Sequence, residues 1–351
     1  MAAPLPSKAP VICGPTAGGK SWLAVELALA LRDRHDIDAQ VVTADAFQVY
    51  AGLNIGTAKP PPEERRGVEH HLIDIVPARS PQPFTLDRWL ALARQTIADL
   101  RARGVLPIVV GGTHLYIKAL LEGLFDGPKA DPALRDALSA MDPGLRRAEL
   151  ERVDPAAAAR IHPNDVRRTV RALEVYRLTG TPISQHQTQW DQAGAVAADE
   201  FQLVILDWDA PALNRRINAR VQDMMSRGLL DEVRWLFDAN AFTPQSAEAL
   251  GYKQLIPIVC RAREEGRWPP AAGAVEKAVE QIKIETRRFG KNQRTWLRRL
   301  GTTPNAVRIA AETTPQEQWV DLVFDRLPLA IAEPPGGPPM GRSTKAAGEE
   351  L

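Results

Sequence analysis

One stretch near the N-terminus constrains this chain more than any other. A short apolar run, Val11-Ile12-Cys13, leads into Gly14, four residues intervene, and Gly19-Lys20-Ser21 then opens an amphipathic segment. The spacing matches the G-x-x-x-x-G-K-[ST] pattern of a phosphate-binding loop between a strand and a helix. Such a loop points backbone N–H groups at an anion, and the following helix adds the positive end of its dipole. The stretch therefore predicts a diphosphate or triphosphate site formed by Gly14, Pro15, Thr16, Ala17, Gly18, Gly19, Lys20 and Ser21.

Composition narrows the class of protein. The 351 residues carry 44 Lys and Arg against 43 Asp and Glu, so the formal net charge of +1 gives no global sign of nucleic-acid binding. Cys13 and Cys260 are far apart and form no C-x-x-C pattern, which argues against a disulfide framework or a cysteine zinc site. No apolar run approaches the length of a membrane helix and no signal-peptide pattern opens the chain, so we expect a cytoplasmic protein.

The order of apolar runs and helical patterns predicts an α/β fold with a parallel sheet of the phosphate-loop type. Strands are expected at about 10–13, 40–44, 71–76 and 105–110, and helices at about 20–33, 85–103 and 114–122. Buried strands that alternate with helices form a parallel sheet covered on both faces, and ligands bind at the carboxyl ends of its strands. We therefore expect the phosphate loop, Asp45 and the turn Gly111-Gly112-Thr113 around one site.

The middle of the chain predicts an all-helical insertion. Asp131-Pro132, Asp142-Pro143 and Asp154-Pro155 each place an N-cap before a proline at the first helical position, and Asn164 or Asp165 caps a fourth helix. After a returning strand at 201–206, we expect helices at about 211–227, 229–239, 246–264 and 271–300, a strand near 306–310 and a helix at 315–326. The predicted division is a catalytic core at 9–125, a helical insertion at 126–200, a second part of the core at 201–326 and a disordered tail at 327–351.

Asp45 closes the second apolar run and has three possible roles. It could hold Mg²⁺ as a nucleotide-site acid, act as a general base, or cap the loop that follows, which is what an aspartate at a strand end most often does. Thr113 presents a similar choice between an ordinary helix N-cap and a hydroxyl that reaches a phosphate oxygen. The preceding glycines, Gly111 and Gly112, indicate that another group approaches the backbone closely.

Two pairs of arginines on expected helices are candidate anion ligands. Arg168 and Arg171 are i, i+3 neighbours in the insertion. Such a pair more often belongs to a solvated basic face, and the more specific interpretation is contact with phosphate groups. Arg216 and Arg220 are i, i+4 neighbours after the returning strand and could clamp an anion or pair with surface acids.

The segment 283–299 carries the strongest basic signal. Glu285 is its single acid, and helical spacing places four cations on one face, namely Arg287, Lys291, Arg294 and Arg298. A solvated face more often interleaves acids with its cations, so this stripe favours a polyanion such as a nucleic acid as its partner.

Taken together, these segments are similar to the tRNA dimethylallyltransferases, also called tRNA isopentenyltransferases, from about residue 10 to about residue 325. The phosphate loop is shared by many families, whereas the run Gly52-Leu53-Asn54-Ile55-Gly56-Thr57-Ala58-Lys59-Pro60 is far more specific. The eukaryotic members' C-terminal zinc finger has no counterpart, so we expect a bacterial-type member. The other matching motifs are Asp45 with Gln48-Val49-Tyr50, Val109-Val110-Gly111-Gly112-Thr113, His162-Pro163-Asn164-Asp165, Arg171-Ala172-Leu173-Glu174, Gly251-Tyr252-Lys253 and Arg294-Thr295-Trp296-Leu297-Arg298.

The resemblance implies a phosphate-loop fold with a helical insertion and transfer of a dimethylallyl group from dimethylallyl diphosphate to tRNA. The implied acceptor is the exocyclic amine of the adenosine 3′-adjacent to the anticodon, in tRNAs that read codons beginning with U. That base must leave its stack to react. The implied cofactor is Mg²⁺ at the diphosphate, with Ser21 as a ligand. The implied partners are the tRNA anticodon stem-loop and dimethylallyl diphosphate, with no membrane, and the chain is expected to be a monomer.

The resemblance also implies roles for individual residues. Asp45 is the general base that anchors the adenine amine, Thr113 contacts the bridging oxygen of the diphosphate, and Arg220 steadies the departing pyrophosphate. Two departures from the family pattern are Ala46, at a position that is commonly Ser, and Glu248-Ala249, which replaces an Arg-containing pattern. The implied tRNA contacts are Asp45, Ala46, Phe47, Gln48, Thr113, Arg135, Arg167, Arg168, Arg171, Lys291, Arg294 and Arg298.

Two other functions explain parts of the sequence. A phosphate-loop kinase for a small molecule or nucleotide would use Asp45 as its metal acid, but it leaves the basic segment 283–299 without a purpose. A non-catalytic RNA-binding NTPase would use the loop and the basic segment alone. Phosphoryl transfer from ATP without prenylation would indicate the kinase. Loss of transfer in Asp45→Asn with tRNA binding retained would exclude the non-catalytic protein.

Overall fold

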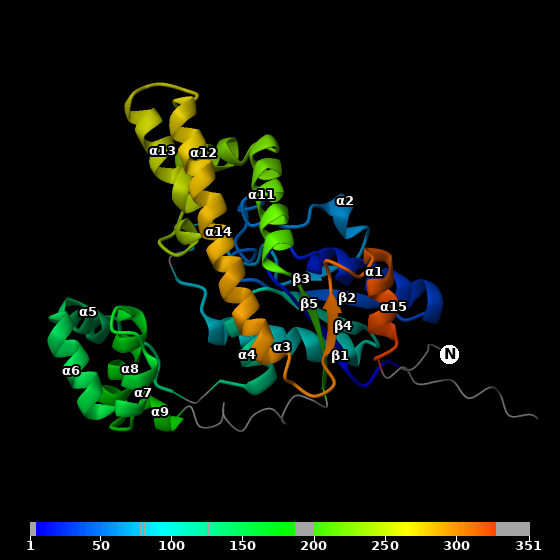
Figure 1. Cartoon of the computed structure of the whole chain (residues 1–351), viewed down its shortest axis with the longest axis horizontal. Coiled ribbons are helices and arrows are strands. Elements are labelled where there is room, and N and C mark those ends of the chain that lie inside the picture. Colours follow the sequence, from blue (N-terminus) through cyan, green and yellow to red (C-terminus); the bar gives the residue numbers. More distant parts are fainter. Residues whose placement is uncertain (1–4, 78, 81, 125–126, 187–199, 328–351) are drawn as a thin grey trace, which may run out of the picture.

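The fold is built on one six-stranded sheet, seen in a computed structural model that describes residues 5–77, 79–80, 82–124, 127–186 and 200–327 (Figure 1). The strand order is β3-β2-β4-β1-β5-β6, and every neighbouring pair is parallel. The predicted parallel α/β sheet is confirmed. The strands are β1 (Ala9–Cys13), β2 (Ala39–Ala44), β3 (His70–His71), β4 (Leu106–Gly111), β5 (Phe201–Asp207) and β6 (Val307–Ala310).

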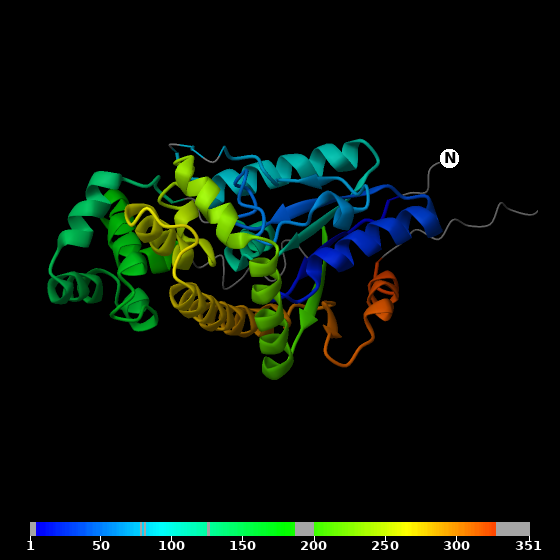
Figure 2. The ribbon, with the colours of Figure 1, turned by 90° about the horizontal axis from the view of Figure 1, so that it is seen from above.

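Both faces of the sheet are buried. Val11 and Cys13 of β1 enter one hydrophobic cluster, and Ile12 between them enters another, because successive strand side chains point to opposite faces. Helices α3 and α4 contribute to the first cluster, and α1 and α15 to the second (Figure 2). These helices are α1 (Lys20–His35), α3 (Leu86–Ala102), α4 (His114–Glu122) and α15 (Trp319–Phe324).

The register of the sheet aligns three strand ends. Cys13 of β1 and Ala44 of β2 both pair with Gly111 of β4, which lies between them. The chain therefore leaves three adjacent strands at one level, and the residues that follow them are Gly14, Asp45 and Gly112.

Four helices extend from the sheet after β5. The last of them, α14, runs from a tip that it forms with α13 down past α11 to the sheet (Figure 1). The prediction of one helix over 246–264 is wrong, because a 3-10 turn at Ser246–Glu248 is followed by a separate helix whose start is capped by Gln254, which accepts from the Gly251 N–H at 2.9 Å. The helices are α11 (Ala210–Ser226), α12 (Leu229–Asp238), α13 (Tyr252–Glu264) and α14 (Ala272–Leu300).

A bundle of short helices lies beside the sheet, at the left of Figures 1 and 2. It has a hydrophobic cluster of its own, with Leu138, Leu150 and Leu173 fully buried. The predicted N-caps are confirmed, since side-chain oxygens of Asp131, Asp142, Asp154 and Asp165 accept from backbone N–H groups. The helices described in this region are α5 (Pro132–Ala140), α6 (Pro143–Val153), α7 (Pro155–Arg160), α8 (Val166–Thr179) and an unpredicted turn of helix, α9 (Ile183–His186).

Two further expectations need correction. The strand predicted at 71–76 is limited to His70–His71, because Leu72 and Asp74 adopt positive φ angles of 59° and 56° that turn the chain. The predicted last helix begins with a 3-10 turn at Gln316–Gln318. Most of the tail predicted at 327–351 lies outside the described residues, as do residues 187–199 of the predicted insertion. Among the helices of the described ranges, none is both long and apolar enough to cross a bilayer.

Candidate active site

The start of α1 offers unpaired backbone donors. A helix leaves its first N–H groups without intrahelical partners. Within the described part of the chain, the N–H groups of Ala17, Gly19, Lys20 and Ser21 donate to no protein acceptor. Gly19 has a φ of 89°, and a Cβ there would lie 2.9 Å from the Trp319 ring, so a larger residue would be strained. These donors, with the positive end of α1, form the predicted anion-binding cradle.

Two side chains hold the outer side of this cradle. Arg216 donates from Nε to the Ala17 carbonyl at 2.7 Å, and its guanidinium lies 4.6 Å from the centre of the Trp208 ring. Trp208 donates from Nε1 to the Gly18 carbonyl at 3.1 Å. Because C=O and N–H point in opposite directions across a trans peptide, this bond turns the Gly19 N–H toward the opposite side. Arg216 was predicted to clamp an anion or pair with acids, and in the structure it braces the loop.

A cavity of about 560 Å³ opens beside the phosphate loop. It lies at the edge where β1, β2 and β4 end, so the predicted meeting of the loop, Asp45 and the glycines Gly111 and Gly112 is confirmed. Thr113, the third residue of that predicted turn, is not among the residues that line the cavity. Of the predicted site residues, it brings together Thr16, Ala17, Gly18, Gly19, Lys20, Ser21, Asp45, Gln48 and Arg220. Lining residues that sequence reasoning did not single out include Glu64, Asp223, Arg227, Phe289 and Gln293.

Asp45 both caps a turn and faces the cavity. Its Oδ1 accepts from the N–H groups of Phe47 at 2.9 Å and Gln48 at 3.2 Å, which fixes the carboxylate in one orientation. Its Oδ2 makes no hydrogen bond to any described residue. One oxygen is therefore held by structure while the other is free to take a proton or bind a cation.

Thr113 occupies the N-cap position of α4 but does not cap it with its side chain. Its hydroxyl oxygen instead accepts from the N–H of Ala46 at 3.1 Å, which ties the turn after β4 to the turn after β2. The predicted close approach at the glycines is confirmed. A Cβ on Gly111 would lie 2.1 Å from the Ala44 carbonyl, and a Cβ on Gly112 would lie 2.7 Å from Nε2 of Gln293.

The cavity concentrates positive charge. Burial, together with the nearby charge of Arg220, lowers the pKa of Lys20 to about 8 against the opposite effect of Asp45. Lys20 Nζ donates to the Pro15 carbonyl at 2.7 Å. Burial also lowers the pKa of Arg220, whose guanidinium has no hydrogen bond or ion pair with the described residues. Asp45 lies near enough for its charge to act on both cations, but neither forms an ion pair with a described residue, and two such cations held close together favour an anionic ligand.

The segment Gly52–Pro60 reaches the cavity with its last four residues, Thr57, Ala58, Lys59 and Pro60, which form one wall. Gln48 donates from Nε2 to the Thr57 and Ala58 carbonyls at 3.1 and 3.2 Å. Lys59 is buried and donates to the Tyr50 carbonyl at 2.9 Å, and it also pairs with Asp74. Lys59 is therefore a structural cation, and the side chain of Gln48 ties this wall to the turn that holds Asp45.

The predicted arginine contacts of the bundle lie away from the cavity. Arg135 makes a two-point pair with Glu174 at 2.9 and 3.0 Å, and Arg171 donates to the same carboxylate at 2.5 Å. Glu174 is fully buried, so these two arginines also hold the bundle together. Arg168 pairs with an aspartate of its own helix start at 3.2 Å, and Arg167 is exposed. Their contact with tRNA stays a prediction.

The predicted cationic stripe of α14 is only partly formed. Lys291 and Arg298 are exposed, and Arg294 is half-buried. The prediction that Arg287 belongs to this stripe is wrong, because its Nη1 donates to Asn218 at 2.7 Å and the side chain is therefore directed toward the neighbouring helix α11. Sequence reasoning also missed Gln293, which faces the opposite way from the exposed cations and is 1% exposed.

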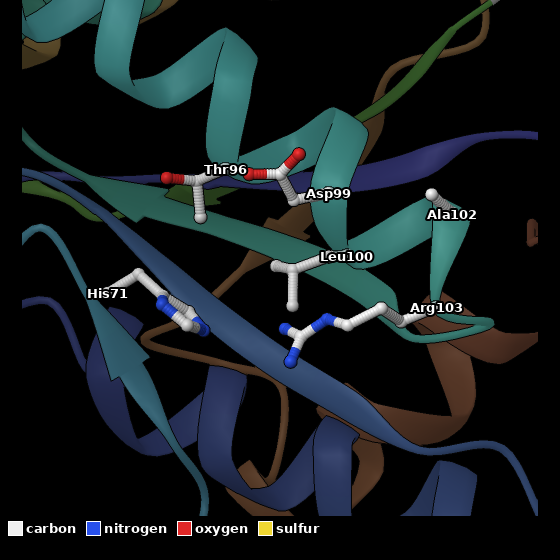
Figure 3. Close-up of a pocket in the computed structure, with 6 residues that line it drawn as sticks. All are labelled: His71, Thr96, Asp99, Leu100, Ala102 and Arg103. Atoms are coloured by element: carbon white, nitrogen blue, oxygen red, sulfur yellow. The ribbon is translucent and has the colours of Figure 1, made fainter.

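A second pocket, of about 520 Å³, lies between β3 and α3 (Figure 3). His71 and Arg103 approach it from opposite sides, with Leu100 between them. His71 already bonds from Nε2 to Gln40 at 2.8 Å. None of the predicted site residues lines this pocket, so the cavity at the phosphate loop is the candidate active site.

Comparison with known proteins places the chain in a family. A family model described as IPP transferase matches residues 48–300. A tRNA dimethylallyltransferase of Geobacillus thermodenitrificans is 41% identical over 294 residues, which cover 82% of this chain and 86% of that protein. The tRNA dimethylallyltransferase 1 of Trichlorobacter lovleyi is 40% identical over 294 residues, which cover 82% and 90%.

Similarity to solved structures supports the same family. The full-length tRNA isopentenylpyrophosphate transferase of Bacillus halodurans superposes with a TM-score of 0.60 at 32% identity, over 92% of this chain and 97% of that one. A eukaryotic dimethylallyltransferase acting on tRNA superposes with a TM-score of 0.71 at 29% identity, over 91% and 77%. With its phosphate loop, its Gly52–Pro60 segment and this degree of similarity, the chain belongs to the IPP transferase family.

Proposed function

We propose that this protein transfers a dimethylallyl group from dimethylallyl diphosphate to tRNA. The acceptor is the exocyclic amine of the adenosine 3′-adjacent to the anticodon, in tRNAs that read codons beginning with U, and diphosphate is released. The observation that carries the proposal is one cavity lined by the phosphate loop, Arg220 and Asp45, whose Oδ2 bonds no described residue. A diphosphate on the loop and an amine on the carboxylate are then neighbours.

In the proposed reaction, the amine nitrogen attacks the first carbon of the dimethylallyl group. The new C–N bond forms as the bond from that carbon to the diphosphate oxygen breaks, and pyrophosphate leaves with the electron pair. Asp45 Oδ2 takes the proton that the amine loses. The N–H groups of Gly19, Lys20 and Ser21, the Lys20 ammonium and the Arg220 guanidinium stabilise the leaving charge. Thr113 donates its O–H to the bridging oxygen.

Mg²⁺ is the proposed cofactor. No group of three or more His, Cys, Asp or Glu side chains suited to a metal occurs within the ranges that the structure describes. Mg²⁺ is commonly held by one or two protein ligands together with substrate phosphates, and the cavity-lining Ser21 hydroxyl, which bonds no described residue, fits such a site. When bound there, Mg²⁺ neutralises negative charge on the diphosphate.

The RNA contacts we propose lie on two surfaces. The helical bundle formed by α5 to α9 would act as the tRNA-binding insertion between two parts of the catalytic core, and the outer side of α14 would meet the phosphate backbone. Asp45, Ala46, Phe47, Gln48 and Thr113 would surround the extruded adenine. The proposed backbone contacts are Arg135, Arg167, Arg168, Arg171, Lys291, Arg294 and Arg298.

The test is a transfer assay with purified protein, Mg²⁺, dimethylallyl diphosphate and a tRNA that reads a codon beginning with U. We expect the RNA to gain one C5H8 unit by mass spectrometry, and no gain when guanosine replaces the adenosine after the anticodon. Asp45→Asn should abolish the gain while the Kd for tRNA stays within about threefold of wild type. Asp33→Asn, an exposed aspartate at the far end of α1, is the matched control and should transfer normally.

Other outcomes would point elsewhere. Phosphoryl transfer from ATP without prenylation would assign the chain to the phosphate-loop kinases. Unchanged transfer in Asp45→Asn would remove Asp45 as the base and leave the proton to another acceptor.

A further inference from the structure

Gln293 joins two loops that no other described side chain connects. It is one of the buried residues of α14, in the last third of the helix, and is 1% exposed. Its Oε1 accepts from the N–H of Thr16 in the phosphate loop at 2.7 Å. Its Nε2 donates to the carbonyl of Gly112, in the turn after β4, at 2.9 Å. Both ends of one amide are thus used, one on each side of the cavity.

The connection continues to the carboxylate. Gly112 is bonded covalently to Thr113, whose hydroxyl oxygen accepts from the N–H of Ala46 at 3.1 Å. Ala46 follows Asp45 directly. Hydrogen bonds and covalent peptide bonds therefore connect the phosphate loop, through Gln293 and the Gly112-Thr113 turn, to the turn that holds the proposed base.

This connection has no backbone substitute. Among the described residues, no backbone hydrogen bond joins the phosphate loop, 14–19, to the turn 45–48. The two segments follow β1 and β2, which are separated by β4 in the sheet. The strands align the points at which the loops begin, but the loops themselves are free to spread apart unless something crosses between them.

On this basis we propose that Gln293 is a positioning residue, which sets the separation between the bound diphosphate and the Asp45 carboxylate. The inference rests on the proposed transfer, in which one loop holds the leaving group and the other holds the attacking amine. Reacting atoms must lie in near contact, and a misplacement of about 1 Å costs about 10²-fold in rate. A bridge between the two loops therefore acts on the rate at which bound substrates react.

The chemistry of an amide suits this position. A glutamine can accept from one N–H and donate to one carbonyl at the same time, whereas a carboxylate can only accept. Glutamate at 293 would face the Gly112 carbonyl without a donor and would place negative charge beside the diphosphate. Methionine has a similar length but replaces neither hydrogen bond. The two substitutions separate loss of the bridge from added charge.

The experiment compares Gln293→Met, Gln293→Asn and Gln293→Glu with wild type. Asparagine keeps the amide but is one methylene shorter, so it cannot reach both loops. Three quantities are measured: the single-turnover transfer rate at saturating substrates, the Kd for inorganic diphosphate with Mg²⁺, and the thermal midpoint. The matched control is Gln281→Met, the same change at an exposed position of the same helix.

We expect Gln293→Met and Gln293→Asn to lower the single-turnover rate by about 10- to 100-fold, with the Kd for diphosphate within about threefold of wild type. Gln293→Glu should lose rate and also bind diphosphate more weakly. Gln281→Met should match wild type in all three measurements. If either the Met or the Asn variant does not fold, as its thermal midpoint would reveal, the other of these two decides the outcome.

Two results would overturn the inference. One is a Met or Asn variant that folds and transfers at a rate within about threefold of wild type. The other is a rate loss matched by an equal loss of diphosphate affinity, which would make Gln293 only a support for the phosphate loop. Wild type is assayed in parallel. Absence of transfer by wild type would contradict the proposed function itself. If wild type transfers normally, either of the two results above contradicts only the role of Gln293.

Discussion

The hydroxyl of Tyr252 donates to Oε1 of Glu232 at 2.6 Å, at a point where that carboxylate also accepts three consecutive backbone N–H groups. Those N–H groups belong to Asn54, Ile55 and Gly56, which directly precede the cavity wall Thr57–Pro60. A single acidic side chain on α12 therefore accepts three backbone N–H groups of the segment that leads into the cavity wall.

Removal of this carboxylate should destabilise the fold. We expect Glu232→Ala to lower the free energy of unfolding by about 1–3 kcal/mol, because several partly buried N–H groups lose their acceptor at once. Urea denaturation followed by circular dichroism measures the change. Glu248→Ala is the control, since Glu248 is 61% exposed and its one ion pair among the described residues is with Lys253, and it should cost less than about 1 kcal/mol. Equal losses in the two variants would contradict the anchoring role.

The pKa of Lys20 makes diphosphate binding depend on pH. Burial lowers this pKa to about 8, so the ammonium loses its proton as the pH rises through that value and the cradle loses a positive charge. Affinity for inorganic diphosphate should therefore fall on the alkaline side. Lys20→Arg stays charged throughout, so the ratio of the wild-type Kd to the Lys20→Arg Kd should rise by about tenfold between pH 7 and pH 9.

The ratio is the useful quantity because it cancels the protonation of diphosphate itself. Isothermal titration calorimetry at fixed Mg²⁺ provides both constants. A ratio that stays constant across this range would show that Lys20 does not titrate there.

The parts of the fold that could be predicted from the sequence are those fixed by local signals. The apolar runs of β1 and β4 and the Asp-Pro starts of α5 and α6 depend on residues within a few positions of each other. The phosphate loop is local too. The site could be placed because strand order and parallel pairing carry such local signals to one edge of the sheet.

The parts that could not be predicted depend on contacts between distant segments. Gln293 sits in a helix whose sequence signals only a cationic stripe, and its partner Thr16 is 277 residues away. Arg287 shares that stripe, yet packing against α11 gives it Asn218 as a partner. Periodicity assigns a residue to a face of its own helix, but the neighbour that covers that face is set by tertiary packing.

Glu174 should make the helical bundle sensitive to acid. Burial raises the pKa of this carboxyl, but hydrogen bonds from Arg135 and Arg171 outweigh burial and hold the pKa below its usual value. A lowered folded pKa gives stability that is fully present above the unfolded value of about 4.3 and is lost as the pH falls through the folded pKa. Glu174→Gln lacks this contribution at every pH.

We therefore expect Glu174→Gln to weaken the bundle by about 1–3 kcal/mol near pH 7, and the difference from wild type to shrink below about pH 4. Hydrogen exchange in α8 and thermal midpoints between pH 3 and pH 7 measure this. The control is Glu151→Gln, which removes a 57% exposed partner of Arg147 in the same bundle and should cost at most about 1 kcal/mol. A difference that does not change with pH would mean that Glu174 carries no charge in the folded protein.

Three cations of α14, two of them exposed and one half-buried, should control RNA affinity and its dependence on salt. Lys291 and Arg298 project from the helix without an ion pair to any described residue, and Arg294 lies between them in sequence. Each cation that neutralises a phosphate releases counterions, so its loss weakens binding most at low salt. We expect Lys291→Ala, Arg294→Ala and Arg298→Ala each to raise the Kd for an anticodon stem-loop RNA and to reduce its salt slope by about 1.

Arg263 on α13 is a suitable control for this surface. It is 62% exposed, like a cation that could meet RNA, but it already pairs with Asp238 at 3.1 Å, so Arg263→Ala should leave the salt slope unchanged. The single-turnover transfer rate at saturating RNA should be close to wild type in all four variants, because these cations bind the RNA and take no part in the reaction. A salt slope unchanged by the α14 substitutions would mean that this face is merely solvated, and the RNA would then have to be held by the bundle.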